Sequence, residues 1–325
     1  MFFASLGFGA HLKRLATAGW SALVICLAIA AAIVVQSLAG MAVARGFGEP
    51  AALGPFMGSI AFPGGHGTAT AWAASSQAQA LPGAFEVSIG SATLGLVLGG
   101  LVAGPVAAWM MHKRRADAAA SILYARDQDT APERAHAFSS DRWLPGLTAL
   151  LACLALGPIL GRWIAGTFDM KLPAFLTVML VGVVLTNLAD MAKRPLDTDV
   201  TDLVGTVALR IFLAIAMLGL DWAALARYLP MLLSAAAVQV VAVAAIAAAL
   251  VYLPMGRDRD AATAGGGFIG FALGAMPVGL AVMRRLDQRF GDTPRALLAI
   301  TLAASLFTDT ANALFLTAMF GWLTP

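Results

Sequence analysis

The sequence predicts an all-α integral membrane protein whose two halves are repeats of inverted topology. Of its 325 residues, 60% are hydrophobic and 12% are charged, whereas a soluble globular domain carries about 25% charged residues. The mean hydropathy is +0.82. Each half also contains one apolar segment that is interrupted by Gly and Pro. Together these observations favour a protein that crosses a bilayer several times and has a broken membrane segment in each half.

The first interrupted segment is Gly58–Ala73, which reads GSIAFPGGHGTATAWA. Pro63, Gly64, Gly65 and Gly67 lie in its middle, between apolar flanks. A continuous helix disfavours this cluster, because Gly is too flexible and Pro lacks a backbone N–H. Non-helical backbone is tolerated at membrane depth only where protein buries it or where it lines a wet cavity. We therefore expect a re-entrant hairpin here.

The second interrupted segment is Gly266–Met283, which is apolar, rich in Gly and broken by Pro277. Two interrupted segments in corresponding places of two halves are a sequence signature of a secondary transporter's binding site. We therefore expect a second re-entrant hairpin, and a substrate path between the two.

The remaining apolar segments predict continuous membrane spans at Ala18–Val43, Val87–Met111, Leu144–Ile164, Leu172–Ala189, Val204–Leu220, Leu229–Leu253 and Arg295–Leu323. Residues 113–142 form the one long polar stretch, which predicts a linker between a first repeat at 1–112 and a second at 143–325. The segment Phe2–Ala10 would rise only about 13 Å as a helix, against a hydrocarbon core of about 30 Å. We expect five spans and a hairpin in each repeat, with the first repeat lacking its opening two spans and part of the third.

The distribution of Lys and Arg predicts the orientation in the membrane. If the linker is cytoplasmic, the basic residues on that side are Lys13, Arg14, Lys113, Arg114, Arg115, Arg126, Arg134, Arg142, Lys193, Arg194, Arg257, Arg259, Arg284, Arg285, Arg289 and Arg295. Those outside are Arg45, Arg162, Lys171 and Arg227. The opposite orientation would invert this excess. We therefore expect a cytoplasmic linker, a periplasmic C-terminus, and hairpins that enter from opposite faces.

Several classes of function are disfavoured by what the sequence lacks. Cys26 and Cys153 both lie in apolar segments, which is typical of small buried residues and not of a disulfide or metal pair. The sequence contains no CxxC, zinc spacing, phosphate loop or dinucleotide-binding pattern. The net charge of +3 comes from basic residues in short loops, so it does not indicate nucleic-acid binding. We expect no enzyme activity and no cofactor other than a coupling ion.

The first hairpin contains the polar groups best suited to a substrate. Backbone N–H and C=O groups at Gly64, Gly65 and Gly67 could bind carboxylates and cations. The hydroxyl of Thr68 could serve either ligand. His66 either contacts the substrate or hydrogen-bonds the broken backbone, and the sequence leaves both interpretations open.

Asp309 lies within the last predicted span, close to Thr308 and Asn312. A carboxylate in a membrane span is costly, so it is expected to face the protein interior and to have a partner. Asp309 and Asn312 are three residues apart, which places them on one helix face. Hard oxygen ligands suit Na⁺ better than a transition metal. The alternative is a hydrogen-bonded brace between helices.

Isolated amides also occur within the spans, at Gln36, Asn187 and Gln239. Each of them either bridges helices or lines the path. Arg210 is a lone base within a predicted span, and its long side chain could extend to the cytoplasmic face.

Four segments resemble the bacterial sodium:glutamate symporter family: Gly58–Trp72, Ala92–Val106, Leu172–Asn187 and Gly270–Met283. The resemblance runs from about Phe2 to the C-terminus. It implies Na⁺-coupled uptake of glutamate, a dimeric inner-membrane protein in the lipid bilayer, and a moving domain that carries both hairpins. It also implies an ion-binding role for Asp309 and Asn312, whose spacing matches the family.

The sequence departs from the family at the second hairpin. The resemblance assigns substrate binding to Gly274, Ala275, Met276 and Pro277, where the family pattern Gly-Ala-Thr-Pro-Thr is here GAMPV. Val282 likewise replaces an Asn, and Arg210 replaces a small polar residue. A site that loses polar partners disfavours the ligand that used them, so a less polar organic anion than glutamate is the alternative substrate.

We therefore expect a cation-coupled secondary transporter that imports glutamate or a related small carboxylate by alternating access. The alternatives are a truncated membrane protein of the same fold that does not transport and, with less support, a channel.

Overall fold

The structure, a computed structural model, describes residues 1–9, 11, 19–75, 78, 81–112, 140–168, 172–192, 198–291 and 293–323. Every regular element in these ranges is helical. The elements are α1 (Phe2–Phe8), α3 (Gly19–Gly46), η1 (Ala51–Met57), α4 (Gly65–Ala73), α6 (Ala84–His112), α7 (Ser140–Phe168), α8 (Ala174–Met191), α9 (Thr198–Leu218), α10 (Trp222–Ile246), η3 (Ala247–Tyr252), α11 (Arg259–Phe290), α12 (Pro294–Ala303), η4 (Ala304–Thr308) and α13 (Asp309–Leu323). Most of the predicted linker, from 113 to 139, lies outside the described residues.

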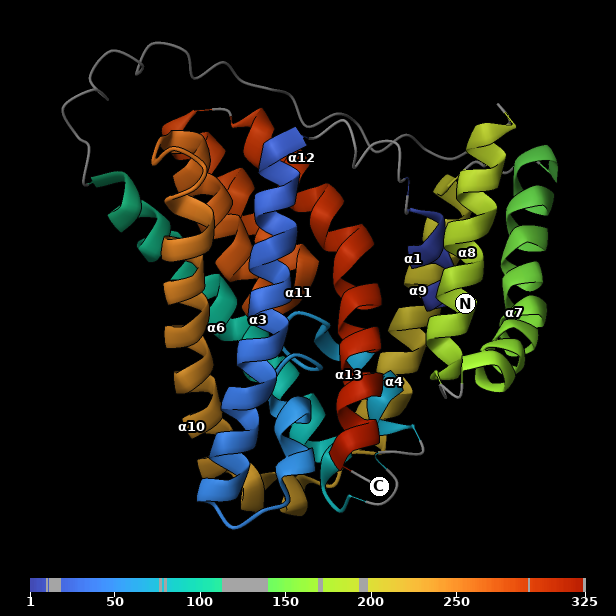
Figure 1. Ribbon diagram of the computed structural model, residues 1–325, viewed down its shortest axis with the longest axis horizontal. Helices are drawn as coiled ribbons and strands as arrows, with labels where there is room; N and C mark the ends of the chain where they lie inside the picture. The colour runs from blue at the N-terminus through green and yellow to red at the C-terminus, as the bar shows by residue number, and fades with distance from the viewer. Residues whose placement is uncertain are drawn as a thin grey trace.

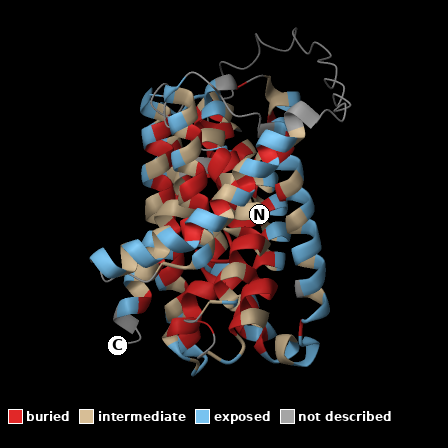
Figure 2. Cartoon of the chain, turned by 90° about the vertical axis from the view of Figure 1, so that its right-hand side faces the viewer, coloured by how far each residue is buried: buried red, intermediate tan, exposed pale blue. Residues whose placement is uncertain are grey.

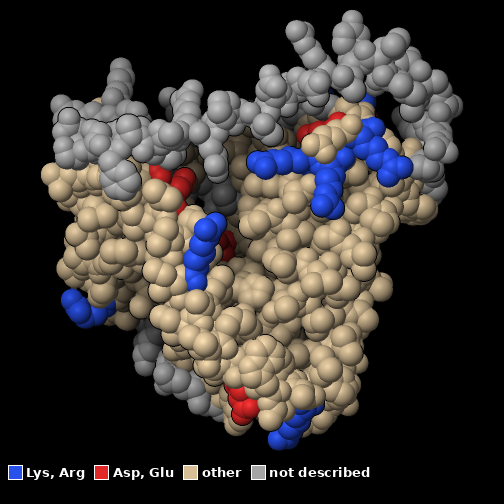
Figure 3. Space-filling model, turned by 180° about the vertical axis from the view of Figure 1, so that it is seen from behind, with Lys and Arg blue, Asp and Glu red and all other residues tan. Residues whose placement is uncertain are grey.

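The helices are long and apolar enough for a multi-pass membrane protein, as the sequence predicts. Six of those in the described ranges could cross a membrane by length and composition, namely Gly19–Gly46, Ala84–Met111, Trp143–Thr167, Ala174–Met191, Trp222–Tyr252 and Arg259–Phe290. Most charged side chains gather towards the two ends of the molecule, and few lie at mid-height (Figure 3). Buried residues concentrate in the interior of the bundle, whereas the outer helix faces are exposed and carry many large apolar side chains (Figure 2).

The helices form two groups that lie side by side (Figure 1). We call α1, α7, α8 and α9 the small bundle, and α3, η1, α4, α6 and α10–α13 the large bundle. The two bundles meet mainly where α4 contacts α9 and where α13 contacts α8. Because α1 packs with α7–α9, each bundle contains helices from both sides of the linker. The division of the chain into two sequence repeats stays a prediction.

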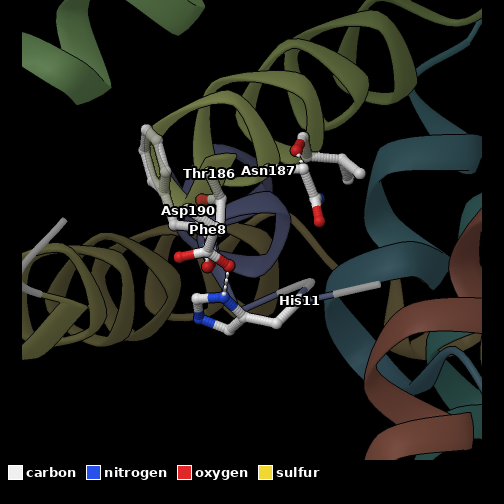
Figure 4. Close-up of polar contacts among 6 residues, drawn as sticks. Phe8, His11, Thr186, Asn187 and Asp190 are labelled. Carbon is white, nitrogen blue, oxygen red and sulfur yellow. Dashed lines mark hydrogen bonds and ion pairs between the residues drawn. The ribbon is translucent and has the colours of Figure 1, made fainter. Parts of the chain in front are cut away.

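The short helix α1 is held tightly against α8. The helices approach so closely that a Cβ on Gly7 would lie 2.3 Å from the carbonyl oxygen of Met179. At the end of α1, His11 Nδ1 lies 2.6 Å from Asp190 Oδ2, and Thr186 Oγ1 donates to Phe8 O at 3.1 Å (Figure 4). These contacts fix a seven-residue helix that would be marginal by itself.

The first interrupted segment is not a continuous helix but folds back on itself. After α3 ends, η1 returns along it, and a Cβ on Gly40 would lie only 2.1 Å from Gly54 O. Residues 58–64 form turns, and α4 begins at Gly65, whose φ is +63°. That backbone region favours glycine, which explains why the tip of the hairpin carries one.

The second interrupted segment is also a hairpin, although its length alone would allow α11 to cross a membrane. Its backbone is non-helical at Gly274 and Ala275, and the two arms fold against each other, with Gly270 facing Gly279. The Arg259 guanidinium donates to Phe290 O, which joins the two ends of the element. The break lies just before Pro277. Ala275 has φ 64° and ψ 176°, a region that is essentially restricted to glycine.

The last predicted span, Arg295–Leu323, is not one regular helix. It consists of α12 and α13 with the π-helical turn η4 between them, and Asp309 is the first residue after that turn. A π-turn disturbs the regular backbone ladder and is frequent at functional sites. This turn brings Asp309 towards the first hairpin.

Glycines on α6 allow its close approach to the second hairpin. A Cβ on Gly95 would lie 2.2 Å from Leu273 O and 2.8 Å from Phe62 Cδ1. A Cβ on Gly99 would lie 3.0 Å from Gly274 N. For Gly100 of the same helix, no atom of the described residues outside the local helix backbone lies within 4 Å of the Cβ position.

Gly95→Ala should therefore destabilise the protein by about 1–3 kcal/mol, the usual range for overpacking a well-filled interior. The matched control is Gly100→Ala on the same helix, which should leave the melting temperature in detergent unchanged or slightly higher. Equal melting temperatures for the two variants would contradict the close packing of α6 against the second hairpin.

Candidate functional site

The tips of the two hairpins touch in the interior of the large bundle. A Cβ on Gly65 would lie 2.8 Å from the Cβ of Ala275, so glycine is required for the contact. The structure therefore brings together the residues predicted to bind substrate: Gly64, Gly65, His66, Gly67 and Thr68 from one tip, and Gly274, Ala275, Met276 and Pro277 from the other. Met276 is half-buried and Pro277 is exposed, whereas Gly274 is buried.

His66 is held by a hydroxyl that the sequence analysis did not single out. Its Nε2 lies 3.1 Å from Thr93 Oγ1 on α6. Because the Thr93 hydroxyl donates to Ile89 O at 2.9 Å, it accepts from His66 and the proton sits on Nε2. This leaves Nδ1 able to accept a hydrogen bond. The only sequence signal for Thr93 is a hydroxyl within a Gly-rich apolar span.

Asp309 has the interior partner that the sequence analysis expected. The hydroxyl of Thr68, one turn beyond Gly65 in α4, donates to Asp309 Oδ1 at 3.2 Å. This hydrogen bond connects the first hairpin to α13. A hydroxyl predicted to bind the substrate or the ion, and the half-buried carboxylate predicted to bind the ion, are therefore in direct contact.

Two further oxygens beside Asp309 have no hydrogen-bond partner among the described residues. Asn312 uses its Nδ2 to donate to Ser59 O at 2.8 Å, but its Oδ1 is buried and unpaired. Thr308 Oγ1 is likewise buried and unpaired. Leaving a buried polar atom unsatisfied costs about 1–3 kcal/mol. A carboxylate with two unsatisfied oxygens on adjacent turns is a donor set that fits a hard cation.

The buried amides Gln36 and Gln239 support the broken backbone. Gln36 Nε2 donates to Ala272 O at 2.9 Å, in the second hairpin. Gln239 Nε2 donates to Gln36 O at 2.8 Å and to Met57 O at 3.2 Å. Their contacts are those of the bridging interpretation. Asn187, by contrast, donates to Val183 O of its own helix at 2.8 Å (Figure 4).

Aromatic side chains fill the contact between the bundles. Trp72 is completely buried, and its ring centroid lies 5.9 Å from that of Phe175 in the small bundle. It lies 5.7 Å from Phe320 in the large bundle. The sequence analysis missed this cluster, because single aromatics in apolar segments carry no signal of which surfaces they join.

Comparison with known proteins identifies relatives over nearly the whole chain. The chain is 34% identical over 329 residues to the sodium/glutamate symporter of Haemophilus influenzae. This alignment covers 98% of this chain and 80% of that protein. It is 33% identical over 319 residues to the sodium/glutamate symporter of Escherichia coli, and this alignment covers 96% of this chain and 79% of that protein. The relative from Shigella flexneri matches to the same extent. No solved structure matches.

These relatives are named as transporters and not as enzymes. The family model described as sodium/glutamate symporter matches residues 1–292. With this match, and with relatives above 30% identity over nearly its full length, the chain belongs to the sodium/glutamate symporter family.

Proposed function

We propose that this protein is a Na⁺-coupled secondary transporter that imports glutamate or a related small carboxylate by alternating access. The observation that carries the proposal is the half-buried Asp309 with the buried Thr308 and Asn312 beside it, a group that contacts the first hairpin through Thr68. The relatives named as sodium/glutamate symporters support the choice of ion and substrate. The proposed partners are Na⁺, the carboxylate, the lipid bilayer and a second copy of the chain in a homodimer.

In this proposal, Na⁺ binds between the Asp309 carboxylate, Asn312 Oδ1 and Thr308 Oγ1. The cation neutralises a carboxylate that is costly to bury and satisfies the two unpaired oxygens. Asp309 then interacts less with the Thr68 hydroxyl, which lies three residues from Gly65 at the contact between the hairpin tips. Occupancy of the cation site therefore changes the position of the tip, which provides a physical route for coupling.

The substrate binds at the tips of the hairpins. Backbone N–H groups at Gly64, His66 and Gly67 bind the carboxylate, since that of Gly65 already donates to Ala61 O, and His66 Nδ1 can accept from the ammonium group of an amino acid. The half-buried Met276 and Val278 make the other side of the site apolar. This apolar side favours a carboxylate with an aliphatic body, and it keeps the less polar anion open as an alternative to glutamate.

Alternating access requires one body to move against another. The large bundle carries both hairpins and is the proposed moving body, whereas the small bundle is the scaffold. The limited contact between them, mainly α4 with α9 and α13 with α8, supports this assignment. The aromatic cluster of Trp72, Phe175 and Phe320 lies at this boundary and offers no directional bonds to break.

Uptake of labelled glutamate into proteoliposomes is the direct test of the proposal. An inward Na⁺ gradient should drive accumulation, and an equal K⁺ gradient should not. Absence of uptake of glutamate and of related carboxylates under both gradients would favour the alternative of a membrane protein that does not transport.

The cation site has a test that does not depend on transport. Na⁺ should raise the melting temperature of the purified protein relative to K⁺ at equal ionic strength, because a ligand that binds the folded state stabilises it. Asp309→Asn and Asn312→Leu should each remove most of this difference. The matched control is Asp190→Asn, which removes a carboxylate in the small bundle and should leave the difference in melting temperature between Na⁺ and K⁺ unchanged. If Asp309→Asn keeps the full Na⁺ effect, Asp309 acts as a brace between helices.

The proposed location is the bacterial inner membrane, with the linker in the cytoplasm and the C-terminus in the periplasm. Labelling of single cysteines with a membrane-impermeant reagent tests this orientation. After replacement of Cys26 and Cys153, Ala119→Cys in the linker should remain unlabelled in intact cells, whereas Ala223→Cys at the start of α10 should react. The reverse pattern would invert the orientation.

A further inference from the structure

We propose that Arg210 of α9 is an anion-binding residue on the scaffold side of the transport path, where it pairs with a carboxylate of the substrate. The proposal rests on the proposed function in so far as the substrate is a carboxylate. It assigns a role to a charged residue that the hairpin site does not use.

The position of Arg210 along α9 requires an explanation. It lies twelve residues after Thr198, or about 18 Å along the helix axis at 1.5 Å per residue. The residues that follow it to Leu218 are apolar. A charged side chain at such a depth is costly in lipid and marks a water-filled path or a partner. Among the described residues, no acidic side chain forms an ion pair with Arg210.

The contacts of neighbouring residues show which parts of the molecule lie close to Arg210. Its neighbour Leu209 reaches the first hairpin, where Leu209 Cδ1 lies 3.3 Å from the Cβ position of Gly67. Met217 is seven residues after Arg210, and therefore on the same helix face. Met217 is partly buried and packs against the hydrophobic cluster shared by the two bundles, which includes Phe62 of the large bundle and Met179 of the small one. The side of α9 next to Arg210 thus contacts the first hairpin through Leu209.

Arg210 is nevertheless exposed, so the bundles do not close over it. Figure 3 shows a groove at mid-height between two bulkier parts of the surface, with a basic side chain lying along it and an acidic side chain visible deeper inside. An exposed arginine whose neighbour contacts the first hairpin is placed to line a groove of this kind. Extension of the guanidinium to the cytoplasmic surface is the competing explanation, but Asp202, the nearest acid towards that end, is two turns or about 12 Å away along the helix.

The hairpin tips offer few charged groups that could bind a second carboxylate, so the Arg210 guanidinium can supply that charge. Among their side chains, His66 is the one that can ionise, and its Nε2 is engaged by Thr93. Met276 and Val278 supply no charge. A guanidinium stays protonated and binds a carboxylate through two parallel hydrogen bonds. Arg210 therefore provides recognition of a second carboxylate, such as that of a glutamate side chain, while the tips bind the α-carboxylate.

The first experiment compares Arg210→Gln and Arg210→Lys with the wild type in proteoliposomes. Arg162→Gln is the matched control, because Arg162 is an exposed arginine of α7 in the same small bundle. Arg210→Gln should raise the KM for glutamate at least about tenfold, the loss expected for a charge-assisted pair. It should also weaken inhibition by dicarboxylates while leaving inhibition by glutamine nearly unchanged. The KM of Arg210→Lys should lie between those of the wild type and Arg210→Gln, since an ammonium keeps the charge but cannot bind a carboxylate bidentately.

The outcomes separate this inference from the proposed function. Uptake by the wild type with no difference between Arg210→Gln and Arg162→Gln would refute the role of Arg210 and leave the transporter intact. Failure of the wild type to take up any carboxylate would count against the proposed function itself.

A second experiment tests Arg210 without transport. In protein lacking Cys26 and Cys153, Arg210→Cys should react with a water-soluble thiol reagent, and glutamate or glutarate should slow that reaction whereas glutamine should not. No reaction would show that the side chain faces lipid. Reaction without protection by dicarboxylates would show an open groove that does not bind them, and either result would overturn the proposal.

Discussion

Breaking a helix inside a membrane leaves backbone N–H and C=O groups that lipid cannot satisfy, and the large bundle is built around two such breaks. Gly40 and Gly54 bring α3 and η1 into backbone contact, and Gly95 brings α6 onto the second hairpin. The amides of Gln36 and Gln239 donate to carbonyls near both breaks. Protein atoms therefore support the broken segments where they depart from helix, which explains why these segments lie at the centre and not at the lipid surface.

The same constraint explains why the polar chemistry of the protein gathers in one place. Once the first segment departs from helix, a buried side chain such as Asn312 can donate to a backbone carbonyl, Ser59 O, that a continuous helix would have satisfied internally. The π-turn η4 provides another departure from helix directly before Asp309. The group of Thr308, Asp309 and Asn312 thus lies in the part of the molecule where lipid is excluded. The Thr308 hydroxyl and the Asn312 amide oxygen are unpaired there among the described residues, so they can bind a ligand.

Much of this arrangement could be predicted from the sequence, because Gly and Pro clusters and a lone carboxylate are strong local signals in apolar segments. The breaks in both segments and the interior partner of Asp309 follow from them. The identity of that partner, Thr68, could not be predicted, since it depends on how α4 and α13 pack across the fold. The break at Gly274–Ala275 precedes Pro277 because proline is tolerated in the first turn of the following arm. The grouping of α1 with α7–α9 likewise depends on contacts distant in sequence.

The central claim is that the cation site at Asp309 and the substrate site at the hairpin tips are energetically linked through Thr68. Linkage is reciprocal, so Na⁺ must change glutamate affinity by the same factor as glutamate changes Na⁺ affinity. The most direct measurement is the Kd for glutamate of the purified protein over a series of Na⁺ concentrations at constant ionic strength. The Kd should fall as Na⁺ rises in the wild type and be independent of Na⁺ in Thr68→Val, which removes the hydroxyl at similar volume. A wild-type Kd that does not change with Na⁺, or an unchanged Na⁺ dependence in Thr68→Val, would contradict the link.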